Sequence, residues 1–319
     1  MEIWILSLIH LMVDALCICC LYLYAGHGDS QHIVEVFFTY TICAFLSQPA
    51  TGIIADKMRK GNMMMIVAVA LFATAIATTA VTEAIEMAGA AGFAIASVLG
   101  IGNSFFHVWG GKIVAIASSN DARSIGFFVS TGALGLALGN VYYSWWMACA
   151  LLVAICAVTA VFTMCNMDRK ASIAAAYQKN NSARLPQPLL WLSMFGLMCI
   201  VAARSFAGSS ITFAEEKTEF AILLAGAISM AGKIAGGLML KHLGTTNTAI
   251  SIAVMVAASM LLTSTWHVAA YVSLFFVNCI MPFTLYFANK LLKDREGLAF
   301  GLLAASLLPG YLLVMWQRL

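Results

Sequence analysis

The sequence predicts an all-α polytopic membrane protein, with about eleven transmembrane helices in two pseudo-repeated bundles. Of its 319 residues, 62% are hydrophobic and only 10% are charged, whereas a typical soluble domain has about 25% charged residues. The mean hydropathy is +0.92. A soluble chain cannot bury so much apolar surface, so soluble enzymes, nucleic-acid-binding proteins and disordered chains are excluded as classes.

Apolar stretches of membrane-spanning length follow one another along almost the whole chain. A helix needs about 20 apolar residues to cross the hydrocarbon core of a bilayer. The eleven stretches are residues 3–25, 33–55, 63–82, 87–117, 124–144, 145–167, 188–213, 220–240, 246–265, 267–290 and 297–316. The first has no basic leader and no A-x-A site, which predicts a span rather than a signal peptide.

The basic residues predict the orientation, because cytoplasmic loops of membrane proteins are enriched in Lys and Arg. With the N-terminus in the cytoplasm, the outer loops hold a single base, Lys217. The cytoplasmic loops then hold Lys57, Arg59, Lys60, Arg123, Arg169, Lys170, Lys179, Arg184, Lys241, Lys290, Lys293 and Arg295. We therefore expect a multi-pass protein of the cytoplasmic membrane with a cytoplasmic N-terminus.

A basic polar segment, residues 168–187, divides the chain into six predicted spans in residues 1–167 and five in residues 188–319. Gly52 stands four residues before Asp56 and Lys57, and Gly236 stands four residues before Leu240 and Lys241. Their offset is close to that between the starts of the first and seventh spans. This indicates a weak internal repeat of six-helix units, the second lacking its last helix.

The loop after the second span has a glycine, an acid and three bases in a recognisable order: Gly52, Asp56, Lys57, Arg59 and Lys60. It resembles the signature loop of the major facilitator superfamily, Gly-x-x-x-Asp-Arg/Lys-x-Gly-Arg-Arg/Lys. The loop departs from that signature at Met58, where glycine is usual, and its basic pair comes one residue early.

Other segments carry the same resemblance. They are Gln48 to Gly52, Gly100 to His107, and His10-x-x-x-Asp14. The last, taken with Phe106-His107, is similar to the branch of the superfamily that contains the fosmidomycin-resistance exporters. The resemblance implies alternating access around a central cavity lined chiefly by the first, fourth, seventh and tenth spans. Eleven spans depart from the twelve that are usual in the family.

Two ionisable groups lie at matching depths in the first and fourth spans. Asp14 is about 16 Å and His107 about 15 Å from the cytoplasmic ends of their helices. His10 precedes Asp14 by one helical turn on the same face. Ionisable residues at mid-membrane are costly and usually functional. We expect His10, Asp14 and His107 to be proton-coupling residues; the alternative is a structural polar contact between helices.

Four further polar residues are candidates for the substrate cavity: Asn103, Arg204, Asn278 and Tyr286. Arg204 lies in the outer third of the seventh span, where it would hold an anionic substrate group or extend to the membrane surface. Asn278 and Tyr286 flank Pro282 in the tenth span, and a proline frees a backbone carbonyl that must be buried or face a cavity. Lys233 in the eighth span is expected to extend to the membrane surface, with a function in the cavity as the alternative.

A conformational gate is predicted at the signature loop, formed by Gly52, Asp56, Lys57, Arg59 and Lys112. Asp56 is expected to accept hydrogen bonds from the positive N-terminus of a neighbouring helix, and Lys112 is expected to pair with Asp56. The alternative is an ordinary basic cytoplasmic loop. In the fifth span, the glycines from Gly126 to Gly139 predict close helix packing.

The predicted function is secondary active transport of a small polar or organic solute, coupled to protons, with import and efflux both open. No Walker A loop, H-E-x-x-H or G-x-S-x-G motif occurs, so an ATP-driven pump or an enzyme is not expected. An uncoupled uniporter or channel remains the alternative, with an integral-membrane enzyme behind it. The expected partners are the solute, the proton and the lipid bilayer, with no nucleic acid. No cofactor or metal is predicted, since Cys17, Cys19 and Cys20 are interpreted as packing residues.

Overall fold

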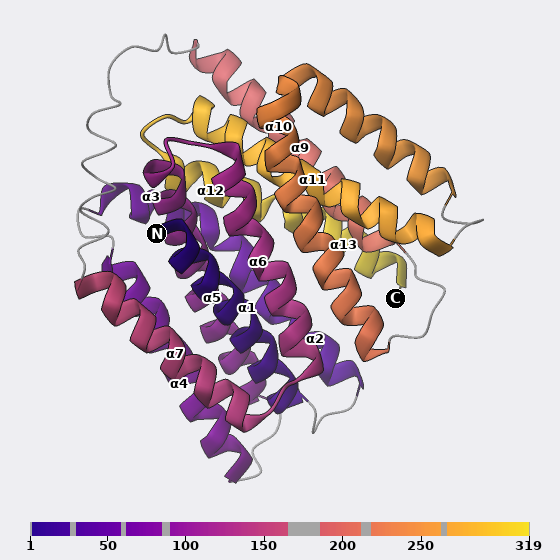
Figure 1. Cartoon of the computed structure of the whole chain (residues 1–319). Helices are drawn as coiled ribbons and strands as arrows, with labels where there is room; N and C mark the ends of the chain where they lie inside the picture. The colour runs from indigo at the N-terminus through magenta and orange to yellow at the C-terminus, as the bar shows by residue number, and fades with distance from the viewer. Residues whose placement is uncertain are drawn as a thin grey trace.

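The computed structural model describes residues 2–25, 30–58, 62–84, 90–164, 186–211, 218–262 and 267–318. Within these ranges the regular structure is entirely helical (Figure 1). Ten of the helical stretches are long and apolar enough to cross a membrane. The predicted all-α, multi-pass membrane fold is confirmed. Most of the linker at residues 168–187 lies outside the described residues, so the division into two bundles stays a prediction.

The helices follow the predicted spans closely. Those before the linker are α1 (Glu2–Ala25), α2 (Ser30–Leu46), α3 (Gln48–Lys57), α4 (Asn62–Ala84), α5 (Ala90–Ala117), α6 (Ala122–Val141) and α7 (Trp145–Met164). Those after it are α9 (Gln187–Ser210), α10 (Glu219–Leu262), α11 (His267–Leu291), α12 (Glu296–Ala305) and α13 (Leu307–Arg318).

The 44-residue helix α10 contains two of the predicted spans. Gly244, in its middle, has non-helical angles, φ 74° and ψ 176°. Glycine adopts a positive φ without the steric cost that other residues incur, so the chain turns here without a loop. Figure 1 shows the two limbs of α10 in orange, meeting at a sharp angle. The ten apolar helices are thus compatible with eleven crossings.

Two other predicted spans are each broken into a pair of helices. The break between α2 and α3 falls at Ser47, and the break between α12 and α13 falls at Ser306. Pro49 lies in the first turn of α3, where a missing backbone N–H costs nothing. The short helices α3 and α12 pack against each other backbone to backbone: a Cβ atom on Gly52 would lie 2.9 Å from the Leu298 Cα.

Helix α6 lies between α1 and α10 and contacts both (Figure 1). On one side, Gly135 and Gly139 lie against the backbone carbonyls of Leu11 and Ala15 in α1. On the other side, a Cβ on Gly126 would lie 2.8 Å from the Lys233 carbonyl oxygen in α10. The glycines of α6 therefore permit close packing on two sides of the helix, as small residues do in membrane proteins.

Candidate functional site

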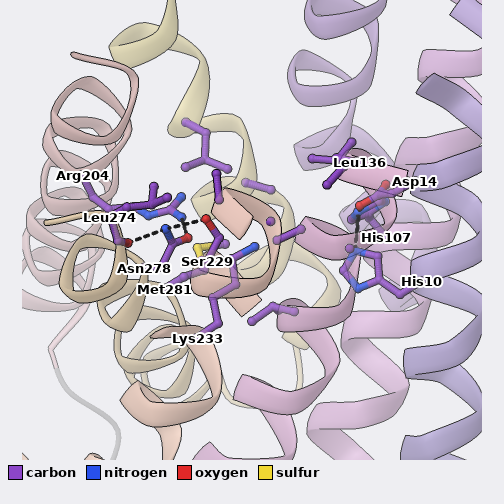
Figure 2. A pocket seen from close by; sticks show the side chains of 18 of the residues that line it. His10, Asp14, His107, Leu136, Arg204, Ser229, Lys233, Leu274, Asn278 and Met281 are labelled. Atoms are coloured by element: carbon purple, nitrogen blue, oxygen red, sulfur yellow. Dashed lines mark hydrogen bonds and ion pairs between the residues drawn. The ribbon is translucent and has the colours of Figure 1, made fainter. Parts of the chain in front are cut away.

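A cavity of about 510 Å³ lies between helices from before and after the linker. Its volume falls in the range of roughly 300–1,000 Å³ that is usual for small-molecule sites. Two polar groups face each other across it (Figure 2). The polar lining residues are His10, Asp14, Gln48, His107, Asn140, Arg204, Ser229, Lys233 and Asn278.

The cavity occupies the half of the molecule that the basic residues assign to the outside. Its lining residues run from Val129 to Asn140 in α6 and from Ile222 to Lys233 in α10. The two helices touch along this stretch and beyond it: a Cβ on Gly226 would lie 3.2 Å from the Ala133 carbonyl oxygen, and one on Gly237 would lie 3.1 Å from the Arg123 Cα. The cavity therefore lies nearer the predicted outer side, and at the predicted cytoplasmic end α3 and α12 are in backbone contact.

On one wall, His10, Asp14 and His107 form a compact hydrogen-bonded group, which we call the trio. The two imidazole Nε2 atoms are 2.8 Å apart. The His10 Nε2 lies 3.3 Å from Asp14 Oδ2, and the His107 Nε2 lies 3.5 Å from Asp14 Oδ1. The structure therefore brings together the three residues for which the sequence predicts proton coupling; that role stays a prediction.

The hydrogen bonds of the trio determine how many protons it holds. The His10 Nδ1 lies 2.7 Å from the Phe128 carbonyl oxygen, and the His107 Nδ1 lies 3.0 Å from the Asn103 carbonyl oxygen. A carbonyl only accepts, so both Nδ1 atoms carry a proton. The bond between the two Nε2 atoms then needs one additional proton, which makes one ring an imidazolium. That positive charge balances the Asp14 carboxylate, and the trio is neutral as a whole.

Proton exchange between the trio and the cavity has a preferred route. The His107 side chain is 15% exposed, compared with 4% for His10 and 8% for Asp14. The rings of Phe106 and Phe128 lie beside His10. His107 is consequently the member of the trio with the best access to the cavity, and His10 is enclosed by aromatic rings and by α6.

The trio is also the group among the described residues whose donor atoms are close enough to hold a metal ion, all lying within 4.8 Å of one another. Two nitrogens bound to a tetrahedral zinc at about 2.0–2.1 Å are roughly 3.3 Å apart. The 2.8 Å between the two Nε2 atoms is shorter and is that of a hydrogen bond. The arrangement therefore fits one shared proton better than a metal ion.

Asn103 has a different place from the one predicted for it. It is buried, and its amide nitrogen donates to Asp14 Oδ1 at 3.0 Å, while its backbone carbonyl accepts from His107. It is not among the residues that line the cavity. Its amide group is turned to Asp14, and its role as a substrate-cavity residue stays a prediction. Asn103 holds two members of the trio in position.

On the opposite wall, Arg204 and Asn278 are joined by a hydrogen bond of 2.7 Å from the guanidinium to the amide oxygen. The Asn278 amide nitrogen donates to the Leu274 carbonyl at 2.8 Å and lies 3.3 Å from the Ser229 hydroxyl. Both residues line the cavity, where the sequence predicts them. Figure 2 shows this cluster facing the trio, with Lys233 below it.

Three lining residues were missed or undervalued by the sequence reasoning: Lys233, Ser229 and Gln48. For Lys233 the sequence favours extension to the membrane surface. Its place between Gly232 and Gly236, which pack against α11, was a usable signal that this part of α10 faces protein. Gln48 is buried, and its side-chain oxygen has no hydrogen-bond partner among the described residues.

Tyr286 is absent from the lining of this cavity, and its role as a substrate-cavity residue stays a prediction. It lies eight residues beyond Asn278, about 12 Å along the helix toward the predicted cytoplasmic end. There its backbone carbonyl accepts from Asn120 at 3.0 Å, and Lys290 lies over its ring. Spacings of four residues place Tyr286 on the same face as Asn278 but at a depth where the helices have closed together.

The signature loop forms contacts across the predicted cytoplasmic end. Asp56 accepts hydrogen bonds from the backbone N–H groups of Gly297 and Leu298, at 2.9 and 2.8 Å, in the first turn of α12. Lys112 donates to the Ala55 carbonyl at 2.7 Å and lies 3.5 Å from Asp56 Oδ1. This is the helix N-terminus contact expected for Asp56; the function of the gate stays a prediction.

The remaining predicted gate residues are less involved in these contacts. Gly52 provides the close approach of α3 to α12 described above. Lys57 is exposed in the last turn of α3, and Arg59 lies outside the described residues.

Replacing Gly132 by alanine is expected to disable the trio. A Cβ on Gly132 would fall against the Asp14 carboxylate and 2.9 Å from the His10 Cδ2, so one of these side chains has to move. Overpacking of this kind typically costs about 1–3 kcal/mol. We expect a lower thermal unfolding midpoint and at least about tenfold slower proton uptake in proteoliposomes. Gly208→Ala is the control, because its Cβ would have an ordinary contact of 3.5 Å; equal losses in the two variants would contradict the argument.

Comparison with known proteins gives matches at the level of structure. No family model and no curated protein sequence matches this chain. The human organic anion transporter MFSD10 (TETRAN) superposes with a TM-score of 0.68 at 15% identity, covering 98% of this chain and 93% of that one. The fucose:proton symporter FucP of E. coli gives 0.66 at 12% identity, covering 98% and 89%. A bacterial homologue of the iron transporter ferroportin, in an outward-facing state, gives 0.54 at 12% identity, covering 99% and 90%.

Proposed function

We propose that this chain, whose fold is that of the major facilitator superfamily transporters, is a secondary active transporter rather than an enzyme. It moves a small organic solute across the membrane by alternating access and couples this movement to protons. The observation that supports the proposal is the trio: three titratable side chains on the cavity wall lie within hydrogen-bonding or ion-pairing distance of one another, in an arrangement that one shared proton would complete.

The proposed cycle uses the two ends of the molecule in turn. In the conformation described, the cavity lies on the predicted outer side, and Asp56 holds the N-terminus of α12 at the predicted cytoplasmic end. Solute and proton occupy the cavity together. Separation of α3 from α12 then exposes the cavity to the other side, where loss of the shared proton leaves two imidazole lone pairs opposed at 2.8 Å. Their repulsion favours rearrangement of the trio.

The similar structures support a transporter without indicating the solute. One is described as an organic anion transporter and another as a fucose:proton symporter, and these solutes differ in charge and polarity. The membrane and the orientation are proposed from the basic residues: the cytoplasmic membrane, with a cytoplasmic N-terminus.

The test is proton movement in proteoliposomes that contain a pH-sensitive dye. Pools of candidate solutes are added without an imposed gradient, and internal pH is recorded against protein-free liposomes and against samples with a protonophore. We expect at least one pool to drive a protein-dependent pH change that the protonophore abolishes. Solute uptake without any proton movement would refute the coupling and support a uniporter; the absence of protein-dependent uptake of any solute would count against transport.

A further inference from the structure

Arg204 is a half-buried cation without a carboxylate partner among the described residues. Its Nε–H donates to the Val277 carbonyl at 3.4 Å, and one terminal nitrogen donates to the Asn278 oxygen at 2.7 Å. A guanidinium has five N–H groups, so most of its hydrogen-bonding capacity has no acceptor in the described part of the chain. Both of its partners are neutral, and its positive charge is uncompensated.

Asn278 fixes the direction of this cation. Because its amide nitrogen is committed to the Leu274 carbonyl and the Ser229 hydroxyl, the amide oxygen must face Arg204. The guanidinium is thereby held at the cavity wall, where both residues are among the lining. Asn278 is a positioning residue for Arg204.

Lys233 adds a second positive charge to the same cavity. It lines the cavity with Arg204 and lies within electrostatic range of both Arg204, which repels it, and Asp14. Among the described lining residues the single carboxylate is Asp14, and the shared proton of the trio already neutralises it. Arg204 and Lys233 are both half-buried, and two cations that line one cavity repel each other unless an anion joins them, so the charge of this wall points to an anionic ligand.

The rest of the cavity indicates the body of that ligand. Between the two polar walls the lining is apolar, and it includes Leu136, Ile222, Leu274 and Met281. A solute with many hydroxyl groups would lose hydrogen bonds to water here without replacement. An apolar body with one compact anionic group matches both the charge and the lining.

We infer that the wall formed by Arg204, Lys233 and Asn278 binds the carboxylate of an amphiphilic organic anion, whose apolar body lies against Leu136, Ile222 and Met281. The carboxylate accepts hydrogen bonds from the free N–H groups of Arg204 and from the Lys233 ammonium. As a statement about the transported substrate, this rests on the proposed function; as a statement about binding, it stands alone.

The test is equilibrium binding by the full-length protein in detergent, followed by its thermal unfolding midpoint. The probes are matched pairs of the same body with a carboxylate or a primary amide, such as benzoate and benzamide, hexanoate and hexanamide, and 4-phenylbutyrate and its amide. We expect at least one carboxylate to raise the midpoint while its amide does not. The apparent dissociation constant should rise by about tenfold or more in Arg204→Gln, as loss of a charge-assisted hydrogen bond predicts, and by less in Lys233→Gln.

The matched control is Lys241→Gln, which removes the same charge from an exposed position two turns further along α10. It should bind like the native protein. Equal stabilisation by a carboxylate and its amide, no stabilisation by any carboxylate, or unchanged carboxylate binding in both cavity variants would each overturn the inference. Should Arg204→Gln fail to fold, Lys233→Gln decides the question.

Failure of this inference is distinguishable from failure of the proposed function. Carboxylate binding that depends on Arg204 but drives no proton movement in proteoliposomes would uphold the binding site and refute coupled transport. Proton movement driven only by neutral solutes would uphold coupled transport and refute the anion site.

Discussion

Replacing Asp14 by asparagine is expected to abolish solute accumulation against a gradient. The carboxylate balances the one proton shared by His10 and His107 at 3.3 and 3.5 Å. Without the carboxylate, the trio has two alternatives. It either keeps the shared proton and a buried positive charge that nothing compensates, or it loses the proton, and the Nε2 lone pairs of His10 and His107 then face each other. Breaking a buried ion pair on one side typically costs about 3–5 kcal/mol, which corresponds to a decrease of at least about 100-fold in occupancy of the protonated state.

The measurement is uphill uptake in proteoliposomes with an imposed pH gradient, together with solute exchange at equal pH on both sides. Asp14→Asn should lose the first and retain the second, because the variant trio without the shared proton is neutral, like the loaded native trio, so the solute-loaded carrier can still reorient. Glu2→Gln removes a carboxylate from the first turn of the same helix and should retain both. Uphill uptake by Asp14→Asn at the native rate would refute the role of the trio.

Replacing Gly52 by valine is expected to separate α3 from α12 and to open the predicted cytoplasmic end. The added side chain would meet the Gly297 carbonyl group and lie 2.9 Å from the Leu298 Cα. These are backbone atoms that cannot rotate away, so the two helices must move apart. Asp56 then loses its hydrogen bonds to the N–H groups of Gly297 and Leu298, and the balance between the two conformations shifts away from the one described.

Hydrogen–deuterium exchange can measure this directly, because the two amides bonded to Asp56 should exchange faster once α12 is released. We expect the peptide covering the start of α12 to exchange at least about tenfold faster in Gly52→Val, with a similar decrease in transport. Gly196→Val is the control, since no atom lies within 4 Å of a Cβ added there. Native exchange in Gly52→Val would show that the close approach of α3 to α12 does not hold this end closed.

The fold was predictable because its signals are local. Apolar runs of membrane length set the helices, and the loop from Gly52 to Lys60 carried the resemblance to the major facilitator superfamily, whose fold the structural comparisons confirm. The pairing of Asp14 with His107 was also accessible, since equal depth in two helices can be calculated from the rise per residue alone. From the sequence, the turn at Gly244 could be predicted only as a boundary between two apolar runs.

What could not be predicted depends on what each helix packs against at each depth. Asn103 and His107 are one turn apart on α5, yet one lies behind Asp14 and the other lines the cavity. Tyr286 shares a face with Asn278 but lies where α11 meets Asn120. Lys233 lies at a depth from which a lysine side chain can also extend to the membrane surface. The packing of α10 against α6 and α11 directs it into the cavity instead.

The neutrality of the trio determines where the membrane potential acts on it. With the shared proton present, the imidazolium and the Asp14 carboxylate cancel, so reorientation of the loaded trio moves no net charge through the electric field. After the proton leaves, the trio carries one negative charge. Moving one elementary charge through 100 mV is worth about 2.3 kcal/mol. In the proposed cycle, the trio therefore contributes to voltage dependence when the deprotonated carrier returns. It contributes none when the carrier reorients with proton and solute bound.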